Sequence, residues 1–225
     1  MNLANRRKEL NALHKGLREA FEGGADAQVA ITKFLELHGI LHSTQVAPEA
    51  SWSYEDFLLA DLEEDLFRRI PENRDHSVLW IVWHLSRIED ITMNMLVAER
   101  EQVFEGGGWQ ERIQSPIKHT CNGTGVDVAE VLSAAVDLKA LRQYRYAVGR
   151  ATRQIVSDLK QEDFKRKPAQ EQLQKILDEG AVLPVGIGVV DYWSRRDVAG
   201  LLLMPPTRHT IVHWNEAKDL LKLKR

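Results

Sequence analysis

The chain has 225 residues, of which 44% are apolar and 28% are charged. These proportions predict one packed domain with decorations and exclude an intrinsically disordered chain. With 30 basic against 33 acidic residues, the formal net charge is −3. The charge therefore gives no positive field that would recruit nucleic acid or an anionic membrane surface.

Cys121 is the single cysteine, which excludes an internal disulfide and indicates a reducing compartment. The first ten residues do not read as a signal peptide. The longest apolar runs, 78–83 and 198–204, are far shorter than the roughly 20 residues that cross a bilayer. We therefore expect a cytoplasmic protein without a membrane partner.

Apolar residues recur at helical spacing along most of the chain, and no stretch alternates with the period of two that marks a strand. The predicted fold class is all-α. Gly23-Gly24 divides the first two helices, Ser53 with Asp56 resembles a capping box, and Asp75 or Ser77 can cap the fourth helix. The helices expected in the N-terminal half cover 2–21, 26–42, 53–70 and 77–101.

The segment 102–136 is rich in glycine and is expected to be a long crossover with one short helix near 127–135. Ser194 with Asp197 can cap a short helix, and Pro205-Pro206 is expected to end it. The segment 183–190 is expected to be extended or looped. The helices expected in the C-terminal half cover 138–160, 169–180, 194–204 and 206–224.

His209 and His213 lie four residues apart in the last predicted helix. Their rings therefore share one face and can converge on a metal ion at about 2.0–2.1 Å. This spacing alone is weak evidence, because such pairs also arise by chance. His38 and His42 form a second pair with the same spacing.

His84 lies on an apolar stripe of the helix 77–101, and His213 shares a stripe with Ala217 and Leu220. A single histidine on such a stripe is more often a core residue with a satisfied ring. Three inward histidines are different, because each buried ring nitrogen needs a partner and one metal ion satisfies all three. The sequence therefore predicts a metal site made of His84, His209 and His213.

Three protein nitrogens with an open fourth position are typical of catalytic rather than structural zinc. The preferred ions are zinc and nickel, and iron, cobalt or manganese also accept imidazole ligands.

The segment Ser77–Asp90, with its Trp-His-Leu-Ser-Arg-Ile-Glu-Asp end, and the downstream pair His209 and His213 resemble the DinB/YfiT-like superfamily. The likeness covers residues 26–225, with 1–25 as a helical extension. It implies a four-helix bundle in up-down-down-up order, with additional connecting helices, and the same three histidines as metal ligands. Either 26–42 or 53–70 could serve as the first bundle helix. If 26–42 does, His38 or His42 could approach the metal.

Some members of that superfamily join small cellular thiols to electrophiles, so the resemblance implies a metal-dependent thiol S-transferase or a hydrolase. Glu89, Asp90 and Glu216 could orient a ligand or act as a base, or could lie on a solvated helix face. The resemblance also implies a homodimer.

A second interpretation is a non-catalytic module of stress response or partner binding that a metal ion merely stabilises. It is favoured by the absence of any other catalytic motif and by the isolation of Cys121, which reads as a buried or loop cysteine. Nucleic-acid binding is third, because the basic clusters 165–167 and 222–225 are short.

Overall fold

The computed structural model describes residues 3–222, and within them it contains helices and no β-strand. The all-α prediction is therefore confirmed. No helix in this part of the chain is both long and apolar enough to cross a membrane. The α-helices and the π- or 3₁₀-helices (η) in chain order are α1 Leu3–Glu22, α2 Ala27–Leu41, α3 Tyr54–Leu59, α4 Glu64–Arg68, α5 Val78–Asp90, η1 Ile91–Val97, α6 Val103–Gly106, α7 Trp109–Ile113, α8 Val126–Ala135, α9 Leu138–Ser157, η2 Gln161–Lys165, α10 Gln170–Asp178, η3 Pro184–Gly186, α11 Ile187–Ser194, α12 Val198–Leu202, η4 Met204–His209 and α13 Thr210–Lys222.

α5 is the central helix of the molecule. Every one of its residues except Trp80 is buried, as expected of a helix that is packed on all sides. Ser77 caps its N-terminus by accepting a hydrogen bond from the Trp80 amide at 3.1 Å. α5 packs most extensively against α9 and also contacts η4 and α13. This packing brings the middle and last thirds of the chain to the same helix.

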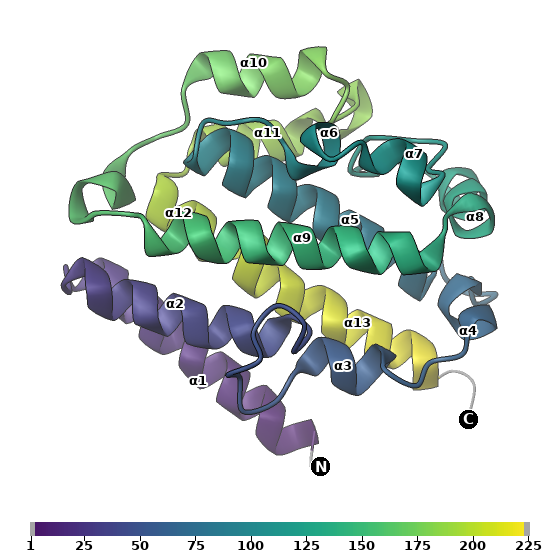
Figure 1. Cartoon of the computed structure of the whole chain (residues 1–225), viewed down its shortest axis with the longest axis horizontal. Helices are drawn as coiled ribbons and strands as arrows, with labels where there is room; N and C mark the ends of the chain where they lie inside the picture. Colours follow the sequence, from purple (N-terminus) through teal and green to yellow (C-terminus); the bar gives the residue numbers. More distant parts are fainter. Residues whose placement is uncertain (1–2, 223–225) are drawn as a thin grey trace.

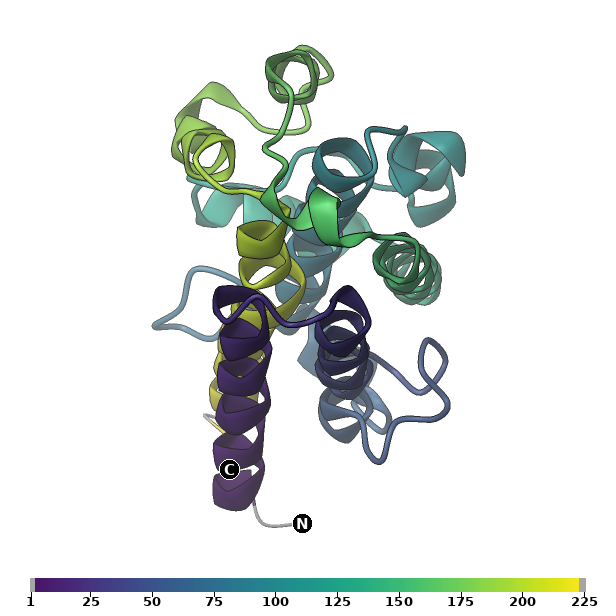
Figure 2. The same ribbon diagram turned by 90° about the vertical axis from the view of Figure 1, so that its left-hand side faces the viewer.

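α1 and α2 form an antiparallel pair that lies on one side of α5 and α9, and α10 lies on the other side (Figures 1 and 2). Gly24 adopts a left-handed conformation in the turn between α1 and α2, with φ +64°, which glycine accepts without strain. α1 also reaches the C-terminal segment, where His14 Nε2 lies 2.9 Å from the Leu203 carbonyl. The division into a 1–25 extension and a 26–225 bundle domain stays a prediction.

The single helix expected over 53–70 is wrong, because the structure has the two short helices α3 and α4 there. Ser53 caps α3 through the Asp56 amide at 2.9 Å. The Asp56 carboxylate does not complete a capping box, because it accepts from the Thr44 amide and hydroxyl instead, at 2.8 and 2.7 Å. α2 is therefore the long helix that packs against α9 and η4. The up-down-down-up order remains an expectation.

One expectation for the C-terminal half is also wrong: the segment 183–190 is not extended or looped but helical, made of η3 and the start of α11. The break expected at Pro205-Pro206 lies close to the predicted place, because α12 ends at Leu202 and the prolines lie in the first turn of the π-helix η4, which leads into α13. The prolines lack N–H groups for the preceding turn, and the Thr207 hydroxyl donates to the Leu202 carbonyl at 2.8 Å in their place.

Candidate metal centre

His84, His209 and His213 come from two helical segments that pack side by side. His84 lies in the middle of α5, His209 ends η4, and His213 lies one turn further in α13. One nitrogen from each ring lies within 4.8 Å of the other two, and the Nε2 atoms of His84 and His209 are 3.2 Å apart. Two ligands of a tetrahedral metal site at about 2.0–2.1 Å from the ion would be about 3.3 Å apart. The spacing of these nitrogens therefore fits a shared divalent ion.

The three rings are inclined to one another rather than stacked. Their interplanar angles are 61° for His84 and His209, 72° for His84 and His213, and 80° for His209 and His213. The lone pair of an imidazole nitrogen lies in the ring plane, so inclined rings can aim three lone pairs at one point. This is the arrangement that a metal ion requires.

Two of the three rings have their outer nitrogen held by an acceptor. His84 Nδ1 donates to the Thr120 carbonyl at 2.6 Å, and His213 Nδ1 donates to the Glu216 carboxylate at 2.7 Å. A carbonyl can only accept, so Nδ1 of His84 carries the proton and Nε2 of the neutral ring keeps its lone pair. Histidines that bind metals commonly have this second contact, which fixes the tautomer and the ring orientation.

The protonation states also suit a cation. Burial and then the neighbouring His213 lower the pKa of His84 to about 3. Burial and then the neighbouring His84 lower the pKa of His209 well below its ordinary value. The pKa of Glu216 is lowered by its contacts with His213 and His76. The centre therefore combines the neutral imidazoles of His84 and His209 with an ionised carboxylate beside them.

A pocket of about 340 Å³ opens directly onto the three rings. Trp80 lines the pocket and stacks on His84, with ring centroids 4.7 Å apart, and the His76 ring lies 4.4 Å from that of Trp80. The loop Cys121–Gly125 also lines the pocket. A small molecule in this pocket would meet the open side of the three nitrogens.

The pocket loop is fixed by backbone contacts. The Trp83 indole donates to the His119 carbonyl at 3.0 Å, and the Thr120 amide donates to the Ala181 carbonyl at 3.0 Å. Cys121 has φ +65° and is buried, and burial raises the pKa of its thiol to about 12. Cys121 therefore stays protonated at neutral pH and is not among the three grouped donors.

The structure separates the three acidic residues that the sequence proposed as helpers. Only Glu216 touches a residue of the centre. Glu89 accepts hydrogen bonds from His38 and His42, which therefore lie with it and not with the other three histidines. Asp90 accepts from the backbone amides of 103 and 104 and from the Tyr144 hydroxyl.

The sequence did not indicate His76, Asn122 or the Thr120 carbonyl. His76 Nε2 lies 3.2 Å from the second oxygen of Glu216, and Asn122 lines the pocket. His76 and Asn122 lie outside any spaced motif, and a backbone carbonyl leaves no trace in a sequence. Only the fold brings these groups to the pocket.

The fold and the three convergent imidazoles define an all-helical protein with a candidate metal centre. A family model of the DinB superfamily matches residues 49–183, which is more than half of the chain. The chain belongs to the DinB superfamily. The matched region contains His84 and ends before His209 and His213, so the geometry alone groups these residues. No curated protein matches this chain.

Proposed function

We propose that this protein is a metal-dependent enzyme that holds a divalent ion with His84, His209 and His213 and acts on a small molecule in the adjoining pocket. The observation that carries the proposal is the open pocket of about 340 Å³ at three inclined imidazoles. A structural site would be closed by a fourth protein ligand, and within residues 3–222 the grouped donors are these three histidines.

A divalent ion in such a site lowers the pKa of a thiol or water that binds to it and thus supplies a nucleophile at neutral pH. The chain's own residues would orient the ligand rings and shape the pocket. Glu216 and the Thr120 carbonyl hold two rings in place, and Trp80 offers an apolar wall to the substrate.

The reaction class that fits best is transfer of a low-molecular-weight thiol to an electrophile, with hydrolysis as the alternative. The thiol would be a substrate, because Cys121 is buried and its pKa is about 12. We further propose zinc or nickel as the ion, a cytoplasmic location and a homodimer, without a nucleic-acid or membrane partner.

The metal assignment is tested by elemental analysis of the purified protein. We expect about one divalent ion per chain, and its loss in His84→Ala and in His213→Ala. His14→Gln is the matched control, since the hydrogen bond of His14 within the described residues is to the Leu203 carbonyl, outside the centre. Full metal content in both alanine variants would refute the ligand assignment.

The enzyme assignment is tested with a panel of cellular thiols against a generic electrophile, alongside an activated ester. Metal-loaded protein should accelerate one of these reactions, and His213→Ala should not. A metal-loaded protein with no rate above the metal-free control would instead favour the metal-stabilised, non-catalytic module.

A further inference from the structure

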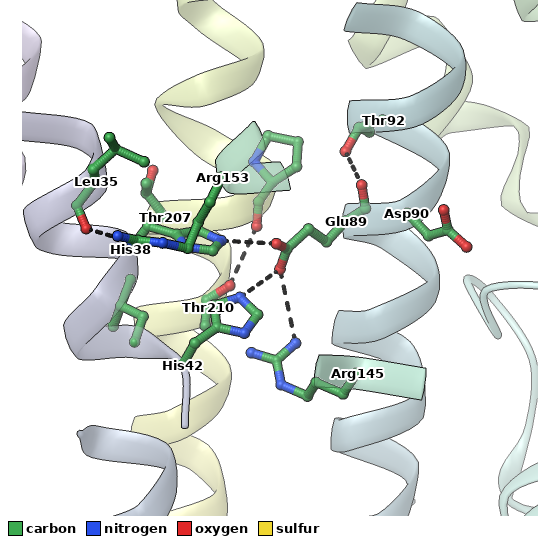
Figure 3. Close-up of polar contacts among 12 residues, drawn as sticks. Leu35, His38, His42, Glu89, Asp90, Thr92, Arg145, Arg153, Thr207 and Thr210 are labelled. Atoms are coloured by element: carbon green, nitrogen blue, oxygen red, sulfur yellow. Dashed lines mark hydrogen bonds and ion pairs between the residues drawn. The ribbon is translucent and has the colours of Figure 1, made fainter. Parts of the chain in front are cut away.

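A second group of three potential metal ligands lies one to two turns along α5 from the metal centre. His38 and His42 of α2 and Glu89 of α5 have fully buried side chains. His38 Nε2 lies 2.9 Å from Glu89 Oε1, and His42 Nε2 lies 2.9 Å from Glu89 Oε2 (Figure 3). We call these three residues the Glu89 clamp.

The ring geometry of the Glu89 clamp differs from that of the metal centre. The rings of His38 and His42 are stacked, with centroids 4.1 Å apart and an interplanar angle of 28°. Nearly parallel rings direct their Nε2 atoms side by side and not at one point. They suit the two oxygens of one carboxylate, and each oxygen indeed receives one ring nitrogen.

The surroundings of the clamp also argue against a cation. Neither Nδ1 of His38 nor that of His42 has a hydrogen-bond partner among the described residues, whereas metal-binding histidines commonly have one and two of the three rings of the metal centre do. Arg145 NH1 lies 3.8 Å from Glu89 Oε2 (Figure 3), so a positive charge already faces this carboxylate. The contacts therefore describe two Nε2–H donors on one carboxylate.

The charges within the clamp agree with its hydrogen bonds. Burial lowers the pKa of both histidines, for His42 to about 3, and outweighs the attraction of Glu89. Burial alone would raise the pKa of Glu89, but His42 and His38 bring it well below its ordinary value. Two neutral rings thus keep one buried carboxylate ionised.

That carboxylate faces a guanidinium that is linked to the metal-binding helix. Arg145 Nε donates to Glu55 at 2.7 Å, but burial raises the pKa of Glu55, which weakens it as a counter-ion. The guanidinium carbon lies 5.1 Å above the Trp214 ring, and the Trp214 indole donates to the Leu41 carbonyl at 2.8 Å. Trp214 directly follows His213 in α13, so these contacts fix the helix that carries two of the metal ligands.

We propose that the Glu89 clamp is a metal-free positioning device, in which His38 and His42 hold an ionised Glu89 that keeps Arg145 against Trp214 and so sets α13 relative to His84. The inference rests on the proposed metal function of His84, His209 and His213. The three residues of the clamp are positioning residues and do not line the pocket at the metal centre.

The test is a cobalt(II) titration of full-length, chelator-treated protein, with the visible absorption spectrum as the readout. Wild type should bind one cobalt ion. Glu89→Gln keeps the side-chain shape and removes the charge, so we expect about tenfold weaker cobalt binding and a changed cobalt spectrum. Glu89→Asp keeps the charge and should retain part of the wild-type affinity, which also covers the case that Glu89→Gln does not fold.

The control is Gln102→Leu, which removes a buried polar side chain that binds Arg87 and Glu179 rather than the clamp. It should lower the unfolding temperature and leave the cobalt affinity and spectrum unchanged. Folded Glu89 variants with wild-type affinity and spectrum would overturn the positioning role.

A wild type that binds two cobalt ions, one of which is lost in Glu89→Gln and the other in His213→Ala, would make the clamp a second metal site and overturn the proposal. A wild type that binds no cobalt would overturn the proposed metal function itself, and with it this inference.

Discussion

Glu216 is the residue that connects the metal centre to the pocket rim. One of its oxygens accepts from His213 Nδ1 at 2.7 Å, and the other lies 3.2 Å from His76 Nε2. Its lowered pKa keeps Glu216 ionised. The carboxylate therefore orients the His213 ring and makes the opposite ring nitrogen a stronger ligand for a cation.

Replacing Glu216 should therefore weaken metal binding without removing a ligand. We expect Glu216→Ala to lower the affinity for zinc by about 10- to 100-fold, measured by competition with a chromophoric chelator. Glu216→Gln should lose less, because its amide oxygen can still accept from Nδ1. Asp219→Asn on the same helix is the control, since among the described residues Asp219 forms ion pairs with Lys218 and Lys222 and none with a histidine of the centre. Equal affinity in Glu216→Ala and wild type would contradict the role of this carboxylate.

The contact between α2 and α9 depends on one glycine. Gly149 of α9 lies where a Cβ atom would be 2.7 Å from His42 Nδ1 and 2.9 Å from Val46 Cγ1. A glycine in the middle of a helix costs conformational entropy, so its presence here is explained by the close approach of the two helices. The glycine gives the His42 ring the space to reach Glu89.

Gly149→Ala should consequently destabilise the protein, by about 1–3 kcal/mol from overpacking, as measured by urea unfolding. Gly188→Ala in α11 is the matched change, because a Cβ there meets no atom within 4 Å. It should be neutral or stabilise by about 0.4–1 kcal/mol. A Gly149→Ala protein as stable as Gly188→Ala would show that the helices can separate without cost.

The whole molecule buries several histidines in their neutral form. In the unfolded chain these rings titrate at their ordinary pKa of about 6.5, but His38 and His42 titrate lower when folded. As the pH falls below about 6.5, the unfolded chain binds protons that the folded protein does not. Stability is therefore complete above this pH and is lost toward lower pH.

For metal-free protein we expect the free energy of unfolding to be flat from pH 8 to 7 and to fall between pH 6.5 and 5. The steepest slope would be about 1.4 kcal/mol per pH unit for each such histidine. Below pH 4.5, the lowered pKa of Glu89 removes further stability. Urea unfolding at fixed pH values measures this.

The raised pKa values of Glu55 and Asp90 oppose this loss, because these carboxyl groups favour the folded protein at low pH. The loss should still dominate, because the lowered pKa values of His84 and His209 add to the destabilisation from His38 and His42. A His42→Gln variant should show a shallower pH dependence. The expectation fails if wild type is equally stable at pH 5 and pH 7.

The sequence by itself determined the helical class, the main long helices and the three histidines that meet at the pocket, because helical spacing and apolar stripes are local patterns. It also indicated the family, through a histidine in α5 and a pair in the last helix. The local capping signal was wrong at Asp56, where a contact from outside the helix replaced it: its carboxylate accepts from Thr44 and not from its own helix.

Only the tertiary structure shows the different surroundings of the two histidine pairs with i, i+4 spacing, on which the proposed choice of metal ligands rests. His38 and His42 have the same spacing as His209 and His213, but their rings are stacked rather than inclined, and an arginine lies near their carboxylate partner. Among the described residues neither of their Nδ1 atoms has a hydrogen-bond partner, whereas that of His213 has one. The partner of His213 Nδ1 is Glu216, three residues along the same chain segment, but the carboxylate and the arginine beside His38 and His42 come from α5 and α9, and Glu89 is 47 positions away from His42. Long-range packing brings these two groups to the pair, and spacing along one helix carries no information about it.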